Sequence, residues 1–121
     1  MAKILVIEDN VQMMNVLKDL LERNNYTVIT AENGAQGVHL YRKDPPDLII
    51  TDMVMPIKGG TQAILDIKQH DPSAKIIAIS GGGLGTAEEY LEVARVLNAR
   101  YTFKKPFSNE ELLTAIKVLI G

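Results

Sequence analysis

The order of apolar and polar positions divides the chain into five short apolar runs separated by segments of helical periodicity. Continuous apolar runs are typical of strands covered on both faces of a sheet, and apolar residues spaced three and four apart are typical of helices. The predicted strands are Lys3–Ile7, Tyr26–Thr30, Leu48–Thr51, Ala74–Ile79 and Arg100–Lys104. The residues expected to face inward from the helices are Met13, Leu17, Leu20, Leu21, Ala35, Val38, Tyr41, Ala63, Ile64, Ile67, Leu91, Ala94, Leu97, Leu112, Ile116 and Leu119.

The helix boundaries carry signals of their own. Asn33, Thr86 and Ser108 are predicted N-caps, and the last two have a glutamate three residues later, which is the capping-box pattern. Pro45-Pro46 and Asp71-Pro72 are expected to end two helices. Since strand and helix alternate five times, we predict an α/β fold, a doubly wound five-stranded parallel sheet with five helices, as one domain over residues 1–121.

Composition narrows the class of protein. The chain has 121 residues, of which 46% are hydrophobic, so it can bury a real core. Its formal net charge of −2 gives no basic excess of the kind that nucleic-acid binding requires. There is no cysteine, which fits a reducing compartment, and the apolar run at the N-terminus is too short to be a signal peptide or to span a membrane. We therefore expect a cytoplasmic protein that binds neither nucleic acid nor membrane.

Polar side chains follow four of the predicted strands, at the point where each strand ends. Glu8 and Asp9 follow the first strand, Asp52 the third, Ser80 the fourth and Lys105 the fifth. The carboxyl ends of parallel strands share one edge of a sheet, where ligands bind. Three carboxylates repel one another unless a cation such as Mg²⁺ offsets their charge. With a lysine and a hydroxyl beside them, they form a candidate phosphoryl-transfer site in which Asp52 is the nucleophile.

Each of these residues also has an ordinary structural interpretation. The acidic pair fits a solvated loop or a helix cap, Asp52 fits a cap, Ser80 fits a turn, and Lys105 fits a surface lysine. The functional interpretation is favoured because all of them fall on the same edge of one sheet.

Four stretches together resemble the receiver domain of two-component response regulators, of the single-domain, chemotaxis-regulator-like kind. They are "ILVIEDN", "DLIITDMVMPIKGG", "IIAISGGG" and "FKKPF", and the resemblance covers essentially the whole chain. It implies the flavodoxin-like strand order 2-1-3-4-5. It also implies a phosphoacceptor signalling domain, which is not an enzyme acting on a separate substrate.

The resemblance also implies roles for individual residues. Asp52 would accept a phosphoryl group from the phosphohistidine of a sensor histidine kinase or phosphotransfer protein. Asp9 would bind Mg²⁺ directly, Glu8 would bind it through water, and the backbone carbonyl of Val54 would be a further ligand.

The phosphoryl oxygens would be held by Ser80 and Lys105, with help from the amide of Gly81. The Lys105–Pro106 peptide bond would be cis. Phosphorylation would switch the surface of the fourth helix, fifth strand and fifth helix for a downstream protein partner, and the family permits a homodimer through the fourth-helix and fifth-strand face.

Two departures from the family pattern alter the expected mechanism. Thr102 stands where a switch aromatic is usual, and Tyr101, one position earlier, should face the opposite side of the strand. Thr102 therefore either signals the phosphorylated state through a hydrogen bond of its hydroxyl or is an ordinary edge-strand residue. Val54 and Gly82, which flank the phosphorylation site in the family pattern, have no polar side chain to position water, so the phosphorylated form should persist.

Other function classes remain open on the sequence. A receiver-like scaffold that is never phosphorylated would keep the same fold. An Mg²⁺-dependent aspartate-nucleophile phosphatase would need a second Asp two residues after the first-strand nucleophile, where Val11 stands. A flavin module would need a hydroxyl- and glycine-rich loop after the first strand, and "EDNVQMM" has neither feature.

The stretch "ISGGGLGT" at residues 79–86 does not match a nucleotide-binding loop. The dinucleotide and Walker patterns require glycine or Gly-Lys at positions occupied by Thr86, Ala87 or Glu88. We predict instead that Ser80 contacts the phosphoryl group and that the glycines after Gly81, including Gly82 and Gly83, form a pliable connector to the next helix.

Overall fold

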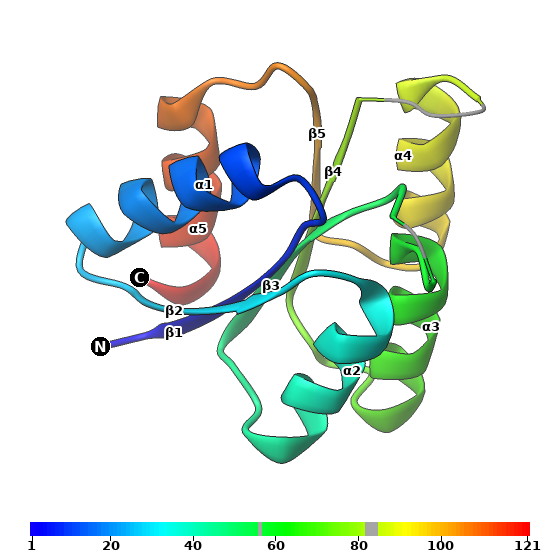
Figure 1. Cartoon of the computed structure of the whole chain (residues 1–121), viewed down its shortest axis with the longest axis horizontal. Coiled ribbons are helices and arrows are strands. Elements are labelled where there is room, and N and C mark those ends of the chain that lie inside the picture. The colour runs from blue at the N-terminus through cyan, green and yellow to red at the C-terminus, as the bar shows by residue number, and fades with distance from the viewer. Residues whose placement is uncertain (56, 82–84) are drawn as a thin grey trace.

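Strands and helices alternate without exception in the computed structural model, which describes residues 1–55, 57–81 and 85–121 (Figure 1). The elements are β1 (Lys3–Ile7), α1 (Val11–Arg23), β2 (Thr27–Ala31), α2 (Gly34–Lys43), β3 (Leu48–Asp52), α3 (Gly60–His70), β4 (Ile76–Ser80), α4 (Ala87–Val96), β5 (Tyr101–Lys104) and α5 (Asn109–Ile120). The predictions on Gly82 and Gly83 lie outside the described residues.

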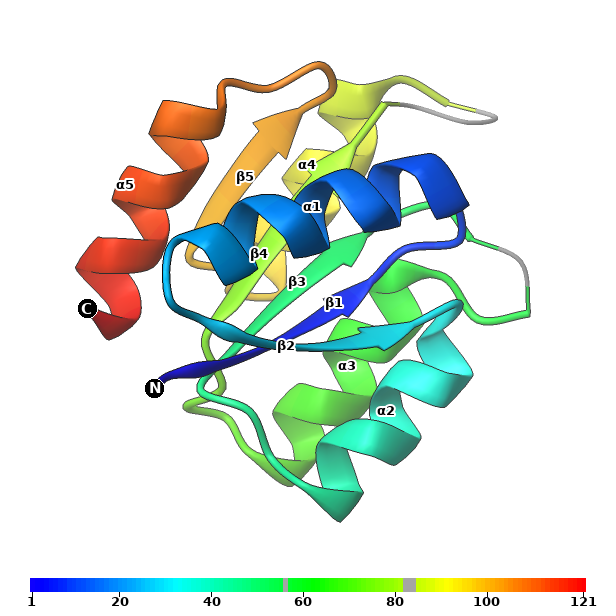
Figure 2. The same cartoon turned by 60° about the vertical axis from the view of Figure 1, so that its left-hand side comes forward.

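The five strands form one parallel sheet in the order β2-β1-β3-β4-β5. This confirms the doubly wound α/β class and the flavodoxin-like order. Helices α1 and α5 cover one face of the sheet, and α2, α3 and α4 cover the other (Figures 1 and 2). The order reverses between β1 and β3, so the carboxyl ends of these two central strands flank the point where a ligand can enter.

The core consists of two apolar layers, one on each face of the sheet. Successive residues of β1 alternate between them, with Leu5 and Ile7 packing beneath α2 and α3 while Ile4 and Val6 pack beneath α1 and α5. Every residue of β3 and β4 is buried. This two-sided burial explains why the strand sequences are apolar throughout.

The inward face of α2 differs from the prediction. Ala35 is exposed, and Gly37 lies over the sheet in its place. A Cβ on Gly37 would lie 2.4 Å from Cδ1 of Ile7, so α2 can approach β1 this closely only because that position carries no side chain. In α1, Met14 is buried and Met13 only half-buried, and three other predicted core residues are half-buried, namely Leu20, Leu97 and Leu119.

Strand boundaries differ from the predicted limits by one or two residues. Tyr26 is buried but precedes β2, and β4 begins at Ile76 rather than at Ala74. β3 and β4 each run one residue further than expected, so that Asp52 and Ser80 are the last residues of their strands.

The predicted helix caps are present. Asn33, Thr86 and Ser108 each accept a hydrogen bond on the side chain from the backbone N–H three residues later. Asn10 caps α1 in the same way, although it was not among the predicted caps. Among the described residues, no helix is long and apolar enough to cross a membrane.

Candidate functional site

The backbone ladder brings the predicted polar residues to one edge of the sheet. The N–H of Glu8 donates to the carbonyl of Ala31 at 3.0 Å, which extends the pairing of β1 with β2. The N–H of Lys105 donates to the carbonyl of Ser80 at 2.9 Å and so ties the end of β5 to the end of β4. Asp52 pairs with Ile79 in register. Residues that are far apart in sequence therefore meet at the carboxyl ends of β1, β3, β4 and β5.

Three carboxylates form a compact cluster at this edge. One oxygen from each of Glu8, Asp9 and Asp52 lies within 4.8 Å of the others. Glu8 and Asp52 are buried, with exposed fractions of 3% and 7%, whereas Asp9 is exposed. The cluster is therefore open to solvent on the Asp9 side, from which an ion or a phosphate donor can arrive.

Lys105 supplies the positive charge that faces this cluster. Its Nζ donates to Oε1 of Glu8 at 2.8 Å and lies 3.5 Å from Oδ1 of Asp52. Burial disfavours the charged ammonium, but the hydrogen bond to Glu8 and the charges of Asp52 and Glu8 outweigh it, and the pKa of Lys105 is raised. The lysine therefore stays protonated beside the carboxylates.

Both carboxylate oxygens of Glu8 already accept a hydrogen bond from the protein itself. Its Oε1 accepts the Lys105 ammonium, and its Oε2 accepts the backbone N–H of Asn10 at 3.2 Å. A metal ion that took a Glu8 oxygen directly would compete with these donors. This arrangement supports contact between Glu8 and a metal ion through a bridging water. It leaves Asp9 and Asp52 as the carboxylates that would bind the metal directly.

Asp52 lies in an environment that disfavours its charge. Burial, and then the negative charge of Glu8, raise the pKa of Asp52 from 3.8 to about 6, although Lys105 and the backbone N–H of Met53 act in the opposite direction. Such a carboxylate gains from any additional cation. The donor set of clustered carboxylates with an open side is the one that Mg²⁺ prefers, so the residues present fit this metal.

Ser80 and Gly81 lie beside Lys105 at the end of β4. Ser80 is fully buried, and Gly81 is exposed. A Cβ on Gly81 would lie 3.5 Å from Cβ and Cδ of Lys105, which is ordinary van der Waals contact. The position therefore tolerates a small side chain, and any contribution of Gly81 comes from its backbone. The Lys105–Pro106 peptide bond is cis, as the resemblance implies.

The two residues considered for the switch lie on opposite faces of β5. Tyr101 and Phe103 line a hollow together with Thr114 and Val118 of α5. Alternation along the strand therefore turns half-buried Thr102 toward the α4 side, as expected. The switch role of Thr102 remains a prediction. Val54 is half-buried against the core beneath α2 and α3. The role of its backbone carbonyl as a metal ligand also remains a prediction.

The need for glycine at position 60 becomes clear only from the packing of α3 against β3. The first residue of α3 lies directly against the end of β3, and a Cβ there would come within 2.4 Å of the Asp52 carbonyl oxygen and 2.8 Å of Met53 Cα. Its N–H donates to the Met53 carbonyl at 3.0 Å. A glycine that follows a strand-end loop signals such a close approach, but the sequence does not identify its partner.

We expect Gly60→Ala to destabilise the protein by about 2 kcal/mol or more, because the new Cβ meets backbone atoms that cannot rotate away. Gly81→Ala is the matched control and should change stability by less than about 1 kcal/mol. Urea unfolding of the two variants measures both effects. Equal stability of Gly60→Ala and the parent chain would contradict this packing.

Comparison of the sequence with known proteins supports the resemblance to receiver domains. A sequence model of the response regulator receiver domain matches residues 4–117. The chain belongs to the response regulator receiver family. This receiver is 36% identical over 117 residues to the chemotaxis protein CheY of Halobacterium salinarum, in a match that covers 96% of this chain and 95% of that protein. It is also 36% identical over 115 residues to CheY of Bacillus subtilis, with 94% and 93% covered.

The fold of this receiver is also that of solved structures. A response regulator receiver domain protein from Clostridium thermocellum superimposes with a TM-score of 0.91 at 30% identity, covering 99% of this chain and 94% of that one. The family places the chain among signalling domains of two-component systems. The individual roles of its site residues remain predictions.

Proposed function

We propose that this receiver accepts a phosphoryl group on Asp52 from the phosphohistidine of a sensor kinase or phosphotransfer protein, in a reaction that requires Mg²⁺. The observation that carries the proposal is the cluster of Glu8, Asp9 and Asp52 with the Lys105 ammonium 3.5 Å from Oδ1 of Asp52. The chain would act as a phosphoacceptor and not as an enzyme with a separate substrate.

The chemistry divides among the residues as follows. An Asp52 oxygen attacks the phosphorus of the donor phosphohistidine, the bond from phosphorus to the histidine nitrogen breaks, and an acyl phosphate forms on Asp52. When bound, Mg²⁺ neutralises charge on the carboxylates and the transferring group. Lys105 donates to a phosphoryl oxygen, and Ser80 and the amide of Gly81 donate from the β4 side.

Transfer to Asp52 would loosen the resting contact between Lys105 and Glu8. In the structure the lysine is closer to Glu8, at 2.8 Å, than to Asp52, at 3.5 Å. A dianionic phosphoryl group on Asp52 attracts the ammonium more strongly than a single carboxylate does. Movement of Lys105 at the end of β5 would thereby carry the signal into β5.

A surface of the receiver that suits the donor protein lies next to the cluster. Asn10, Gln12, Met13 and Val16 of the α1 region line a hollow together with Lys105. Val11 and Val16 of the same helix are 69% and 56% exposed and add apolar surface on this side. Apolar contacts here would orient a phosphohistidine toward Asp52.

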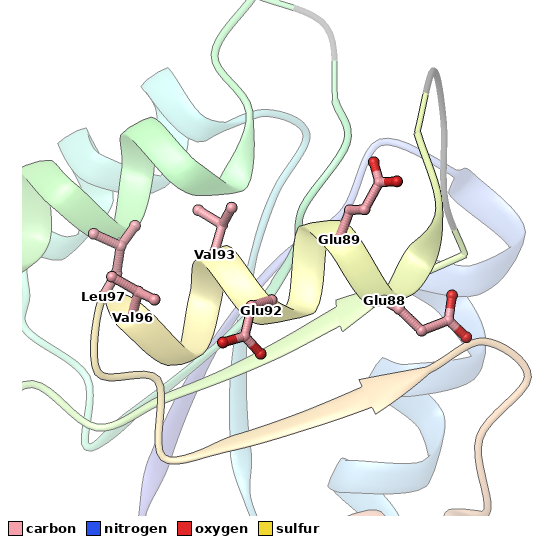
Figure 3. Close-up of a pocket in the computed structure, with 6 residues that line it drawn as sticks. All are labelled: Glu88, Glu89, Glu92, Val93, Val96 and Leu97. Atoms are coloured by element: carbon pink, nitrogen blue, oxygen red, sulfur yellow. The ribbon is translucent and has the colours of Figure 1, made fainter.

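A second surface would serve the downstream partner. Along α4 lie Glu88, Glu89 and Glu92 and then Val93, Val96 and Leu97, which together line a shallow hollow (Figure 3). Lys104 of β5 donates to Glu88 at 2.6 Å, so that the first turn of α4 is tied to the strand that ends at the site. A partner with cationic and apolar side chains fits this face.

The phosphorylated form should persist, because Val54 offers no polar side chain to position an attacking water. Gly82, the other position that flanks the site in the family pattern, lies outside the described residues. The loss of phosphate from the purified phosphoprotein in Mg²⁺ measures the lifetime. A half-life of seconds would contradict the expectation of slow loss.

Dependence on Mg²⁺ separates this function from that of a receiver-like scaffold. On incubation with a small acyl phosphate, intact-mass measurement should show addition of one phosphoryl group with Mg²⁺ and none with a chelator. A scaffold that is never phosphorylated would gain no mass in either condition. The phosphatase alternative has no support from the family assignment.

A further inference from the structure

Between β3 and α3 the backbone adopts a conformation at Ile57 that this side chain disfavours. Ile57 has a φ of 70°, in the left-handed region that β-branched residues rarely adopt, and its side chain is 85% exposed. Because the side chain is exposed, it gains little from packing that could offset the cost of this conformation. Asn25 and Asn98 have the same φ sign, which asparagine tolerates far better. The conformation of Ile57 is therefore imposed by the residues around it.

The next residue, Lys58, is held from two sides. Its backbone carbonyl accepts a hydrogen bond at 2.8 Å from the N–H of Gly34, the first residue of α2. Its Nζ donates to Oδ2 of Asp66 on α3, and Oδ1 of Asp66 accepts from Nε2 of Gln62 at 3.0 Å. The hydrogen bond from Lys58 lowers the pKa of Asp66, so this acid stays charged at neutral pH. Lys58 thus joins the segment after β3 to two helices that lie side by side (Figures 1 and 2).

The contact between Lys58 and α2 requires glycine at position 34. A Cβ there would lie 2.5 Å from the carbonyl oxygen of Lys58 and 2.8 Å from its Cγ. Both distances are shorter than real Cβ contacts allow, so any side chain on Gly34 would displace Lys58. We name the contacts of Lys58 with Gly34 and Asp66 the loop clamp.

The loop clamp lies close to the phosphoacceptor. Asp52 is the last residue of β3, and Val54, whose carbonyl is predicted to bind the metal, comes four positions before Lys58. Two residues after Lys58, the N–H of Gly60 donates to the carbonyl of Met53 at 3.0 Å. The backbone is therefore fixed next to Asp52 by Gly60 and fastened to α2 and α3 by Lys58.

We propose that Lys58 is a positioning residue for the metal site, because the loop clamp holds Ile57 in its left-handed conformation and thereby keeps the Val54 carbonyl in place for Mg²⁺. This inference rests on the proposed function, of which the Mg²⁺ site is a part. Lys58 does not touch the metal in this scheme. It keeps most molecules in the conformation that binds the metal, and the apparent affinity falls in proportion when only a fraction of the molecules is competent.

Removing the ammonium of Lys58 tests its role in metal binding. We expect Lys58→Met to weaken Mg²⁺ binding about fivefold, and Lys58→Arg, which keeps a cation within reach of Asp66, to stay within about twofold of the parent chain. Lys3→Met is the matched control, because it breaks a similarly part-buried ion pair with Asp44 at the amino end of β1 and should leave Mg²⁺ affinity unchanged. Titration with Mg²⁺, followed by nuclear magnetic resonance, measures each affinity.

A substitution at position 57 separates positioning from general stability. Glycine adopts positive φ without strain, so the clamp is no longer needed in an Ile57→Gly chain. Ile57→Gly alone should bind Mg²⁺ at least as tightly as the parent chain, and adding Lys58→Met to it should weaken binding by less than about twofold. An ion pair that only stabilised the fold would give the same loss with and without Ile57→Gly.

Hydrogen exchange follows the clamp without any metal. The Gly34 amide donates to the Lys58 carbonyl, and its exchange should become at least about fivefold faster in Lys58→Met and in Asp66→Asn, which breaks the same pair from α3. Adding Ile57→Gly to Lys58→Met should restore most of the protection.

The outcomes distinguish this inference from the proposed function. Binding of Mg²⁺ that is equal in the parent chain and in folded Lys58→Met overturns the inference alone. Equal losses with and without Ile57→Gly, or an unchanged exchange rate at Gly34, overturn it equally. A parent chain that binds no Mg²⁺ overturns the proposed function together with the inference.

Discussion

Asp52→Asn is expected to stabilise the folded chain by about 3 kcal/mol at pH 7 in the absence of divalent cations. Burial and the charge of Glu8 raise the pKa of Asp52 from 3.8 to about 6. Every tenfold change in proton affinity between the unfolded and folded states corresponds to about 1.4 kcal/mol. At pH 7 Asp52 is charged in both states, but burial and Glu8 make the charged carboxylate less favourable in the folded state, so it opposes folding at neutral pH. Asparagine has nearly the same shape and removes that charge.

The sign of the pH dependence follows from linkage. Between about pH 4 and pH 6 the folded state binds more protons at Asp52 than the unfolded state does, so Asp52 makes stability fall as pH rises. The advantage of Asp52→Asn should accordingly be absent below about pH 4, grow through this window and level off above it. Urea unfolding at several pH values measures this difference.

A control variant and added Mg²⁺ make the unfolding measurement more specific to Asp52. Asp19→Asn removes an exposed acid that pairs with Arg23, and it should change stability by less than about 1 kcal/mol at any of these pH values. Adding Mg²⁺ should stabilise the parent chain more than Asp52→Asn, because the ion binds the charged cluster in the folded state. A constant difference between the two chains from pH 4 to pH 7 would contradict the account.

Lys105→Met is expected to destabilise the protein by about 3 kcal/mol at pH 7. The substitution keeps most of the apolar side chain but removes the cation that pairs with Glu8 at 2.8 Å, and Glu8 is only 3% exposed. Removing one partner of a buried pair leaves an uncompensated charge in a poorly solvated place. The loss should be largest without Mg²⁺, because the metal can replace part of the missing positive charge.

The neighbouring lysine provides a matched control. Lys104 pairs with Glu88, but both side chains are largely exposed, at 61% and 66%. Lys104→Met should therefore cost less than about 1 kcal/mol. Glu8→Gln in the Lys105→Met background should recover part of the lost stability, because it removes the unpaired carboxylate. Equal effects of the two lysine substitutions, or no recovery in the double variant, would show that the Glu8–Lys105 pair does not hold the site together.

Much of the fold was predictable because local signals agreed with the global packing. Ile49 and Ile50 face opposite layers of the core, so a strand buried on both sides can be read from an unbroken apolar run. Asn33 and Thr86 sit where a side-chain oxygen can cap a helix, and they do so. The prediction for Ala35 was wrong because helical period alone does not say which small residue meets the sheet. Gly37 does, and its position depends on how closely α2 approaches Ile7.

The sequence predicts which residues gather at the candidate site, but it does not predict the contacts among them. Strand-end positions place Asp52 and Lys105 at one edge for reasons of topology alone. The preference of Lys105 for Glu8 over Asp52 depends on side-chain conformations in a crowded, poorly solvated pocket. The contact of Gly60 with the Asp52 carbonyl likewise arises from the path of a loop and not from a periodic pattern.

The identity of the phosphorylated residue tests the central claim most directly. The parent chain, Asp52→Asn and the control Asp19→Asn are each incubated with Mg²⁺ and a small acyl phosphate, and the intact mass of each protein is measured. We predict one added phosphoryl group on the parent chain and on Asp19→Asn, and none on Asp52→Asn. Addition to Asp52→Asn at the rate of the parent chain, or no addition to the parent chain at all, would contradict the account.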